Sequence, residues 1–377
     1  MTRRGNREGS IRQRPGGLWE AQLLLQGRRR SVYGRTRQDV LEKLRQLQAG
    51  ASAGLPVTPA RLTTGDYLSR WLQQVEPRLR PRTVQHYRYM VRLLTGPEAG
   101  IARVRLAQLQ PDQVEQALAR LQTSGLSPRT CWHARNVLRC ALGDAIRWRV
   151  LAQNAAQIAD APRIAHQPPR ILTPEEALAV IAAMTDPDLR RLVGIALWTG
   201  LRQGELLGLR WPDVDLIGAE VHVTAALQRV EGEYRLVEVK SASSRRTVPL
   251  TEAAVTALEE QRHWQVEARL AAGGRWREPI PGLVFTTSTG SPRSASAITH
   301  AFARALSAAG LPPMHWHHLR HGFAGLLLAT GSDLATVSGL LGHTSVALTA
   351  STYAGVAPSL KRQAADRLGL LLERRPG

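Results

Sequence analysis

The sequence of 377 residues predicts a mainly α-helical, multidomain protein with small β-sheets, an α+β fold. Apolar residues recur at helical spacing over much of the chain, as at Tyr67, Trp71 and Val75. Short strand-like pieces bounded by turn signals occur near the N-terminus and again in the second half. A chain of this length accommodates about two or three domains.

Residues 1–50 predict a three-stranded sheet followed by one helix. The turn sequences PGG and QG divide the first part into three strand-like pieces. Val40, Leu44 and Leu47 then recur at helical spacing, and the helix is expected to end at Gly50. The segment is strongly basic, and a small sheet can enter a DNA groove. Its candidate DNA-contacting residues are Arg12, Arg14, Arg28, Arg29 and Arg30.

Residues 51–61 have the composition of a linker, and residues 62–165 predict a helical domain. Pro111 and Pro128 mark helix starts, and Gly125 ends one helix. Arginines recur on several of these helices, either on a solvated face or on a surface that faces DNA. The large positive charge of the chain favours the second interpretation. The candidate contacts are Arg80, Arg82, Arg88, Arg129 and Arg135.

The last domain is expected to span residues 172–377. It opens with a capping box in which Thr173 is the N-cap, Pro174 takes the first helical position and Glu176 completes the box. EVHVTAAL, YRLVEVK and RRTVPL read as three short strands, and helices follow to a C-terminal tail helix. An apolar stripe on that tail helix comprises Leu360, Ala364, Leu368 and Leu371. The stripe could pack on its own domain or on a neighbouring protomer.

The charge of the chain indicates a polyanionic partner. Lys and Arg number 50 against 30 Asp and Glu, a net charge of +20. Nucleic acid is the first candidate and an anionic membrane the second. No apolar run approaches the ~20 residues needed to span a bilayer, and no secretory signal opens the sequence. Cys131 and Cys140 are too few for a disulfide framework, so we expect a cytoplasmic protein.

Four separated segments of the last domain carry polar residues in apolar surroundings. In WTGLRQGELLGLRW, Arg202 follows the helix-ending Gly200 and opens a new helix, where free N–H groups suit an anion. An arginine there could grip a phosphate in two places, and Glu205, three residues on, could hold its guanidinium group. Lys240 precedes a Ser/Ala turn, where a lysine is most often simply exposed.

The segments MHWHHLRHGFAGLLLATG and GLLGHTSVALTASTYAG add further candidates. His317 and Arg320 are three residues apart and so share a helical face. His343 lies in a Leu-Gly-His turn, and Tyr353 follows a run of small residues with little apolar company. The cluster His315, His317, His318 and His321 also permits a metal site, but the adjacent arginine and the missing carboxylate disfavour it.

This set fits phosphoryl transfer to a protein hydroxyl without a metal. The arginines would stabilise charge on the nonbridging phosphate oxygens. Tyr353 would be the nucleophile, and because its free pKa is about 10 it needs a nearby base such as His317. Lys240 could protonate the leaving sugar oxygen.

The sequence resembles the tyrosine recombinases of the phage-integrase family. The resemblance rests on TGLRQGEL, VKSASSRRTVPL, HHLRHGFAGLLLATG and LLGHTSVALTASTYAG, in the family's order, and it extends to most of the chain. It implies an N-terminal arm-type DNA-binding domain, a helical core-binding domain of the SAM-like kind and a mixed α/β catalytic domain. His318 stands where the family commonly has aspartate, and Ser241 where threonine is frequent.

The resemblance also implies roles for matched residues. Arg202 and Arg320 correspond to the phosphate-clamping arginines, and Lys240 to the residue that protonates the 5′-hydroxyl. His317 helps to move the tyrosine's proton, and His343 binds a phosphate oxygen. Tyr353 forms a 3′-phosphotyrosyl link. Because bond energy is conserved in the exchange, no cofactor, metal or ATP is expected.

The implied function is site-specific DNA recombination that integrates or excises a mobile element such as a prophage. The implied partners are double-stranded DNA at core and arm attachment sites, a homotetramer on DNA, and possible DNA-bending and excision factors, with no membrane. The implied location is the cytoplasm, at the nucleoid. The alternatives are a type IB topoisomerase-like nicking-closing enzyme, a non-catalytic DNA-binding regulator and a metal-dependent nuclease that uses the histidines.

Overall fold

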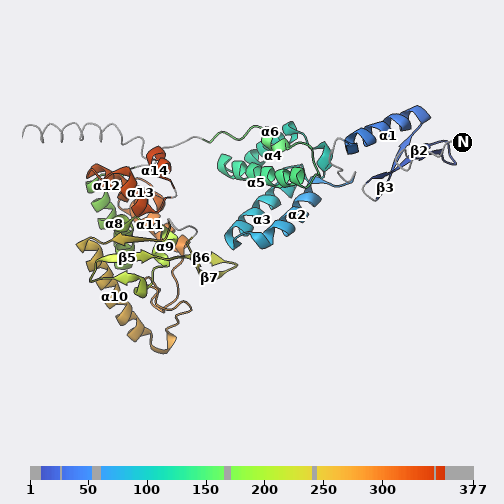
Figure 1. The fold of residues 1–377 in the computed structure, drawn as a ribbon. Helices are drawn as coiled ribbons and strands as arrows, with labels where there is room; N and C mark the ends of the chain where they lie inside the picture. Colours follow the sequence, from blue (N-terminus) through green and yellow to red (C-terminus); the bar gives the residue numbers. More distant parts are fainter. Residues whose placement is uncertain are drawn as a thin grey trace, which may run out of the picture. The chain divides into compact units, whose positions relative to one another are not determined.

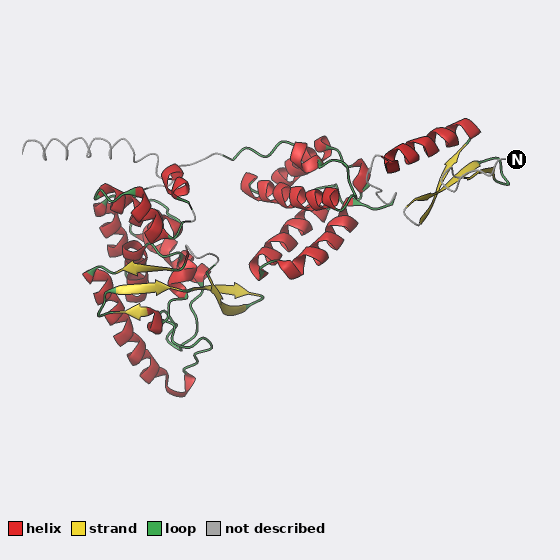
Figure 2. Cartoon of the chain, viewed as in Figure 1, coloured by secondary structure: helices red, strands yellow, loops and turns green. Residues whose placement is uncertain are grey.

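The computed structural model describes residues 10–25, 28–52, 61–164, 171–239, 244–343 and 345–352. The chain divides into two compact units, Met1–Ala165 and His166–Gly377. The described part is mainly helical with small antiparallel sheets, as the sequence predicts (Figures 1 and 2). Among these residues, no helix is both long and apolar enough to cross a membrane.

The N-terminal part of the first unit is an antiparallel sheet covered by one helix. The strand order is β1-β2-β3, and Ala21 and Leu23 of the sheet pack with Val40 and Leu44 of the helix. The elements are β1 (Ser10–Gln13), β2 (Trp19–Leu25), β3 (Arg28–Gly34) and α1 (Arg37–Ser52). The predicted topology is confirmed, but the helix continues past Gly50, because a glycine within a helix costs only about 1 kcal/mol.

The rest of the first unit is helical and has its own apolar core. Its elements are α2 (Thr64–Val75), η1 (Glu76–Arg78), α3 (Pro81–Thr95), η2 (Leu106–Gln108), α4 (Pro111–Thr123), α5 (Pro128–Arg147) and α6 (Ala155–Ile158). Two buried aromatic residues of α2 fix it against α5. The Tyr67 hydroxyl donates to the Ala141 carbonyl at 2.7 Å, and Trp71 Nε1 donates to Asp144 at 2.7 Å. Proline at the first position of α3, α4 and α5 sets the helix starts.

The second unit is built mainly from helices around one large core. The helices are α7 (Pro174–Ala182), α8 (Pro187–Thr199), α9 (Gln203–Leu207), η3 (Trp211–Asp213), α10 (Glu252–Ala272), η5 (Gly273–Arg275), α11 (Ala295–Ala308), α12 (His317–Ala329), α13 (Leu334–Leu341) and α14 (Val346–Thr352). The predicted capping box of Thr173 and Glu176 is present at the start of α7. The helices α8 and α13 both pack against α12, so their C-terminal ends meet near it (Figure 1).

Two small sheets complete the second unit. One sheet has the order β4-β5-β8, and the other is the hairpin β6-β7. The strands are β4 (Val214–Asp215), β5 (Glu220–Val223), β6 (Ala225–Val230), β7 (Glu233–Glu238) and β8 (Arg246–Pro249). The prediction that EVHVTAAL forms one strand was wrong. The segment divides at Thr224 between the two sheets, and Thr224 binds Asp213 there through its hydroxyl.

Candidate active site

Arg320 joins the C-terminal ends of two helices. It lies in the first turn of α12, and its side chain is almost fully buried. Nη1 donates to the Gly200 carbonyl at 2.7 Å, and Nη2 donates to the Leu341 carbonyl. Gly200 ends α8 with φ of 62°, a left-handed conformation that glycine adopts readily. Because helix C-termini leave carbonyls unpaired and partially negative, a guanidinium group is a favourable partner for both.

Arg202 is the more exposed arginine of the site. It is the N-cap of α9, and its side chain is 38% exposed. Nη1 forms an ion pair with Glu205 at 2.7 Å, and Nη2 donates to the Gly342 carbonyl at 3.2 Å. The backbone N–H of Arg202 also donates to Glu205, at 3.0 Å. Glu205 therefore holds the guanidinium group as its position in the sequence suggests, and part of that group remains open to solvent.

Glu205 is a buried carboxylate that receives a second arginine. Its side chain is 4% exposed, and Arg246 Nη2 reaches its Oε2 at 2.9 Å. Burial alone would raise the pKa of Glu205. Hydrogen bonding from Arg246 and the charges of Arg246 and Arg202 outweigh burial, so the pKa lies below its usual value. The carboxylate is charged at neutral pH and can orient both guanidinium groups.

His343 follows directly after the end of α13. Its Nδ1 lies 2.8 Å from the hydroxyl of the fully buried Thr349 on α14. Burial, followed by the charges of Arg320 and Arg202, lowers the pKa of His343 to about 4. The imidazole is therefore neutral near pH 7, and Thr349 orients its ring.

His317 begins α12, one turn before Arg320. Burial and then the charges of Arg320 and Arg202 lower the pKa of His317. Its ring also meets that of His321 edge-on, with centroids 4.8 Å apart. Burial, together with the charge of His317, lowers the pKa of His321 to about 4. A neutral His317 has a free ring nitrogen for a proton, which a general base requires.

Two of the six predicted catalytic residues lie outside the described residues. These are Lys240, which follows Val239 in the sequence, and Tyr353, which follows Thr352 at the end of α14. Ser241 and the apolar stripe predicted for the C-terminal tail helix lie outside them too. The other four residues occupy one region of the second unit, around the C-terminal end of α13.

Sequence reasoning missed two residues in this region, Arg246 and Thr349. Arg246 lies in RRTVPL, whose alternating pattern predicted only a strand. Thr349 stands among small residues that offer no periodicity. No sequence signal separates Arg246 from its neighbour Arg245, because the two arginines stand side by side at the start of the same strand-like segment.

The structure contains no group of three or more His, Cys, Asp or Glu residues that could hold a metal ion within the described ranges. The rings of His317, His318 and His321 on α12, and of His315 just before it, form tilted and edge-on pairs.

The predicted DNA-contacting arginines differ in how free they are. Arg80, Arg82 and Arg129 are exposed near the starts of α3 and α5. Arg88 pairs with Glu76. Arg135 donates to the Ala159 carbonyl through Nε at 3.0 Å, so at least part of its guanidinium group caps α6.

In the N-terminal sheet, Arg12 and Arg14 both pair with Glu20, at 2.9 and 3.0 Å. Both arginine side chains are at least half exposed, while Glu20 is covered. A hydrogen bond from Gln22, together with bonds from the two arginines and Tyr33, lowers the pKa of Glu20 to about 2 despite its burial. Arg28, Arg29 and Arg30 occupy the first positions of β3.

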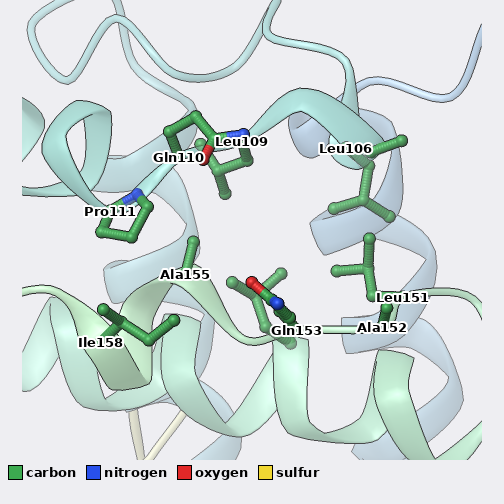
Figure 3. Close-up of a pocket in the computed structure, with 11 residues that line it drawn as sticks. Leu106, Leu109, Gln110, Pro111, Leu151, Ala152, Gln153, Ala155 and Ile158 are labelled. Atoms are coloured by element: carbon green, nitrogen blue, oxygen red, sulfur yellow. The ribbon is translucent and has the colours of Figure 1, made fainter.

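A pocket of about 200 Å³ lies in the helical part of the first unit (Figure 3). Leucines, alanines, Pro111 and Ile158 line it together with two glutamines. No lining residue is ionisable, so this hollow offers neither an acid–base pair nor a nucleophile. The predicted catalytic residues that the structure describes lie in the second unit and are not among the residues that line this pocket.

Two arginines, a buried carboxylate and two histidines with lowered pKa values therefore gather in one region of the second unit. The model of the phage integrase family matches residues 170–359, a range that includes all six predicted catalytic residues. The chain belongs to this family.

Curated relatives agree with this membership. The chain is 29% identical over 361 residues to a tyrosine recombinase XerC-like protein of Caldanaerobacter subterraneus, covering 90% of this chain and 91% of the relative. It is 30% identical over 327 residues to an integrase of Streptomyces ambofaciens, covering 85% and 83%.

Solved structures share the fold at lower identity. The Tn1549 transposon integrase in complex with a circular intermediate DNA has a TM-score of 0.70 and 21% identity, covering 81% of this chain and 99% of that one. A lambda integrase tetramer bound to a Holliday junction has a TM-score of 0.57 and 19% identity, covering 89% and 95%.

Proposed function

We propose that the protein is a site-specific DNA recombinase that cleaves and rejoins strands through a 3′-phosphotyrosyl intermediate. The observation that carries the proposal is the meeting of Arg202, Arg320 and His343 around one helix end. Cationic and N–H donors gathered there can stabilise the charge of a phosphodiester in its transition state. The integrase and recombinase relatives support recombination over nicking and closing alone.

In the proposed cleavage step, the Tyr353 oxygen attacks the phosphorus and the bond to the 5′ oxygen breaks. His317 accepts the phenolic proton, and Lys240 gives a proton to the leaving 5′ oxygen. The number of phosphoester bonds is unchanged, so the step needs no external energy source. A 5′-hydroxyl from another strand reverses the same step and completes the exchange.

His343 would donate a hydrogen bond to a nonbridging phosphate oxygen. A neutral imidazole can do so only if its proton is on Nε2. Thr349 supports that tautomer when its hydroxyl donates to Nδ1. Arg202 is open to the phosphate, whereas Arg320 is 3% exposed and can contact a phosphate only if covering groups move.

The proposed organisation follows the predicted boundaries. Residues 1–50 would bind arm sites, residues 62–165 would bind the core site after a linker at 51–61, and residues 172–377 would carry the chemistry. The exposed Arg80, Arg82 and Arg129 are the best-placed core contacts, while Arg88 and Arg135 would have to give up present partners to contribute both ends of their guanidinium groups.

The proposed assembly is a homotetramer on two duplexes, as the lambda integrase tetramer on a Holliday junction illustrates for that protein. DNA-bending and excision factors would assist it, and it would act in the cytoplasm at the nucleoid. A mobile element, such as a prophage, would be its substrate.

The decisive experiment uses the DNA that flanks the gene. A direct repeat found there gives the sequence of the candidate core site. A duplex of that sequence with a nick near the cleavage position traps the covalent adduct. Paired intact duplexes of the same sequence are the substrates of a strand-exchange assay. The wild-type chain should form the adduct with a chelator present and should yield joined products. Tyr353→Phe should bind the duplex with similar affinity but form no adduct, because it lacks the attacking oxygen.

Three other results would contradict parts of the proposed function. An adduct formed by Tyr353→Phe would reassign the nucleophile. Nicking and closing without joined products would favour the topoisomerase-like alternative. Cleavage that requires a divalent ion would favour a nuclease.

A further inference from the structure

Arg246 is a buried arginine to which the proposed chemistry gives no role. It is the first residue of β8, and its side chain is 6% exposed. It donates through Nη2 to Glu205 at 2.9 Å, through Nε to the Leu340 carbonyl at 2.6 Å and through Nη1 to the Ser244 carbonyl at 3.2 Å. All three nitrogens of the guanidinium group therefore have acceptors within the protein.

The Leu340 contact places Arg246 in a row of three guanidinium groups at the end of α13. Arg246 binds the carbonyl of residue 340, Arg320 that of residue 341 and Arg202 that of residue 342. The three arginines come from β8, α12 and the start of α9, elements far apart in the sequence. The last carbonyls of a helix have no partner within it, so these donors fix the turn from which His343 emerges.

The charges at Glu205 give Arg246 a second effect. A pair of Arg202 and Glu205 alone would be neutral, and its field at a phosphate would be weak. With Arg246 included, the cluster of Arg202, Glu205 and Arg246 has a net charge of +1, because one carboxylate is shared between two guanidinium groups. The exposed end of Arg202 can then act as a cation although it is paired.

We propose that Arg246 is a positioning residue of the strand-cleavage site, which holds Glu205 and the end of α13 so that Arg202 and His343 face the phosphate. The proposal rests on the proposed recombinase function. Arg246 does not touch DNA in this arrangement, because its nitrogens are directed to internal acceptors. It therefore governs the rate of the chemical step rather than the affinity for DNA.

Lysine cannot replace this arginine. Three acceptors lie around a planar fork, and an ammonium group on a flexible stem cannot reach all of them. Arg246→Lys keeps the charge and removes the fork, whereas Arg246→Gln removes the charge as well. Arg245→Lys is the matched control, since the neighbouring Arg245 is 61% exposed and pairs only at the surface with Glu238 in the contacts described.

The experiment measures single-turnover adduct formation by the full chain on the nicked duplex at saturating protein. We expect Arg246→Lys to be slower by about 10–100-fold, by analogy with the loss caused by removing a group that orients a metal ligand. DNA affinity should stay within about threefold, because the phosphate contacts that dominate binding remain. Arg245→Lys should cleave at the wild-type rate.

A double-mutant cycle separates positioning from a general structural role. If Arg246 acts through Glu205, Arg246→Lys should slow a Glu205→Gln variant by a smaller factor than it slows the wild type. Equal factors in both backgrounds would overturn the proposal. Wild-type rates for Arg246→Lys and Arg246→Gln would overturn it as well.

Stability is controlled by measuring rates where each variant is folded, as judged by its melting curve. A decrease in the cleavage rate that is proportional to the loss of folded protein would contradict a positioning role. If one of Arg246→Gln and Arg246→Lys does not fold, the cleavage rate of the other variant provides the test. Failure of the proposed function is distinguishable, because the wild-type chain would then form no adduct at all.

Discussion

A buried glutamate flanked by two arginines occurs twice in the molecule, once in the N-terminal sheet and once in the second unit. Around Glu20, the arginine side chains are 61% and 51% exposed. Around Glu205, they are 38% and 6% exposed, and both guanidinium groups also bind the end of α13.

The two arrangements have the same formal charge and different freedom. The sheet leaves both cations able to adjust to a polyanion, which suits binding through phosphate contacts. The second unit fixes one cation fully and the other in part, which suits a reaction that depends on preorganised charge. What distinguishes them is the second set of acceptors, the backbone carbonyls.

The largest effect should come from the clamp arginines. Arg202→Ala and Arg320→Ala should each slow adduct formation by about 10²–10³-fold, the cost of removing one preorganised donor. Arg320→Ala should lower the melting temperature more than Arg202→Ala, because it leaves two buried carbonyls without that donor, at about 1–3 kcal/mol for each unsatisfied group. In Arg202→Ala one carbonyl loses its donor, and Glu205 keeps its contact with Arg246. Equal melting temperatures for the two variants would contradict the assignment of Arg320 as the buried member.

A smaller effect is expected at Thr349. Thr349→Val keeps the shape but removes the hydroxyl beside Nδ1, so the His343 ring loses the partner that orients it. Adduct formation should slow by about tenfold, by analogy with the smaller losses caused by removing a hydrogen-bond partner that orients a metal-binding histidine. Thr349→Ser should restore most of the rate, and the adduct assay with both variants measures this. A Val variant as fast as the wild type would show that the ring is held by other contacts.

The smallest effect concerns acid stability. His321 and His343 have folded pKa values of about 4 against 6.5 in the unfolded chain. As pH falls from 6.5 towards 4, the unfolded chain therefore binds protons that the folded protein does not, and stability falls. Glu20, with a pKa of about 2 against 4.5, loses its contribution only as pH falls below 4.5 towards 2.

Hydrogen exchange measured at pH 7, 5.5 and 4.5 shows which part of the protein is destabilised first as the pH falls, the second unit or the N-terminal sheet. The second unit should lose protection first, and its melting temperature should drop by about 2–4 °C for each kcal/mol lost. His321→Asn should flatten that drop. Loss of protection in the sheet before the second unit would reverse the comparison.

The fold was largely predictable because its signals are local. Capping boxes, prolines at helix starts and apolar spacing depend on residues a few positions apart, as at Thr173 and Glu176. The division of EVHVTAAL was not predictable, since the two halves pair with strands elsewhere in the chain. The extension of α1 past Gly50 reflects the small cost of a glycine within a helix.

The site was predictable in its residue types and less so in its geometry. The spacing of Arg202 and Glu205 predicts their pairing, because the first turn of a helix brings these positions together. The three arginines at the end of α13 could not be foreseen, since their acceptors are backbone carbonyls that no side-chain pattern marks. The burial of Arg320 has the same origin.

The three acceptors of these arginines are consecutive residues, so each one is defined by its count along α13. Inserting or deleting one residue between Leu334 and Leu341 would shift all three carbonyls by one position, so none would face its present arginine. The segment would still be predicted as a helix from its sequence. The length of one eight-residue helix is therefore as restricted as the identity of the arginines around it.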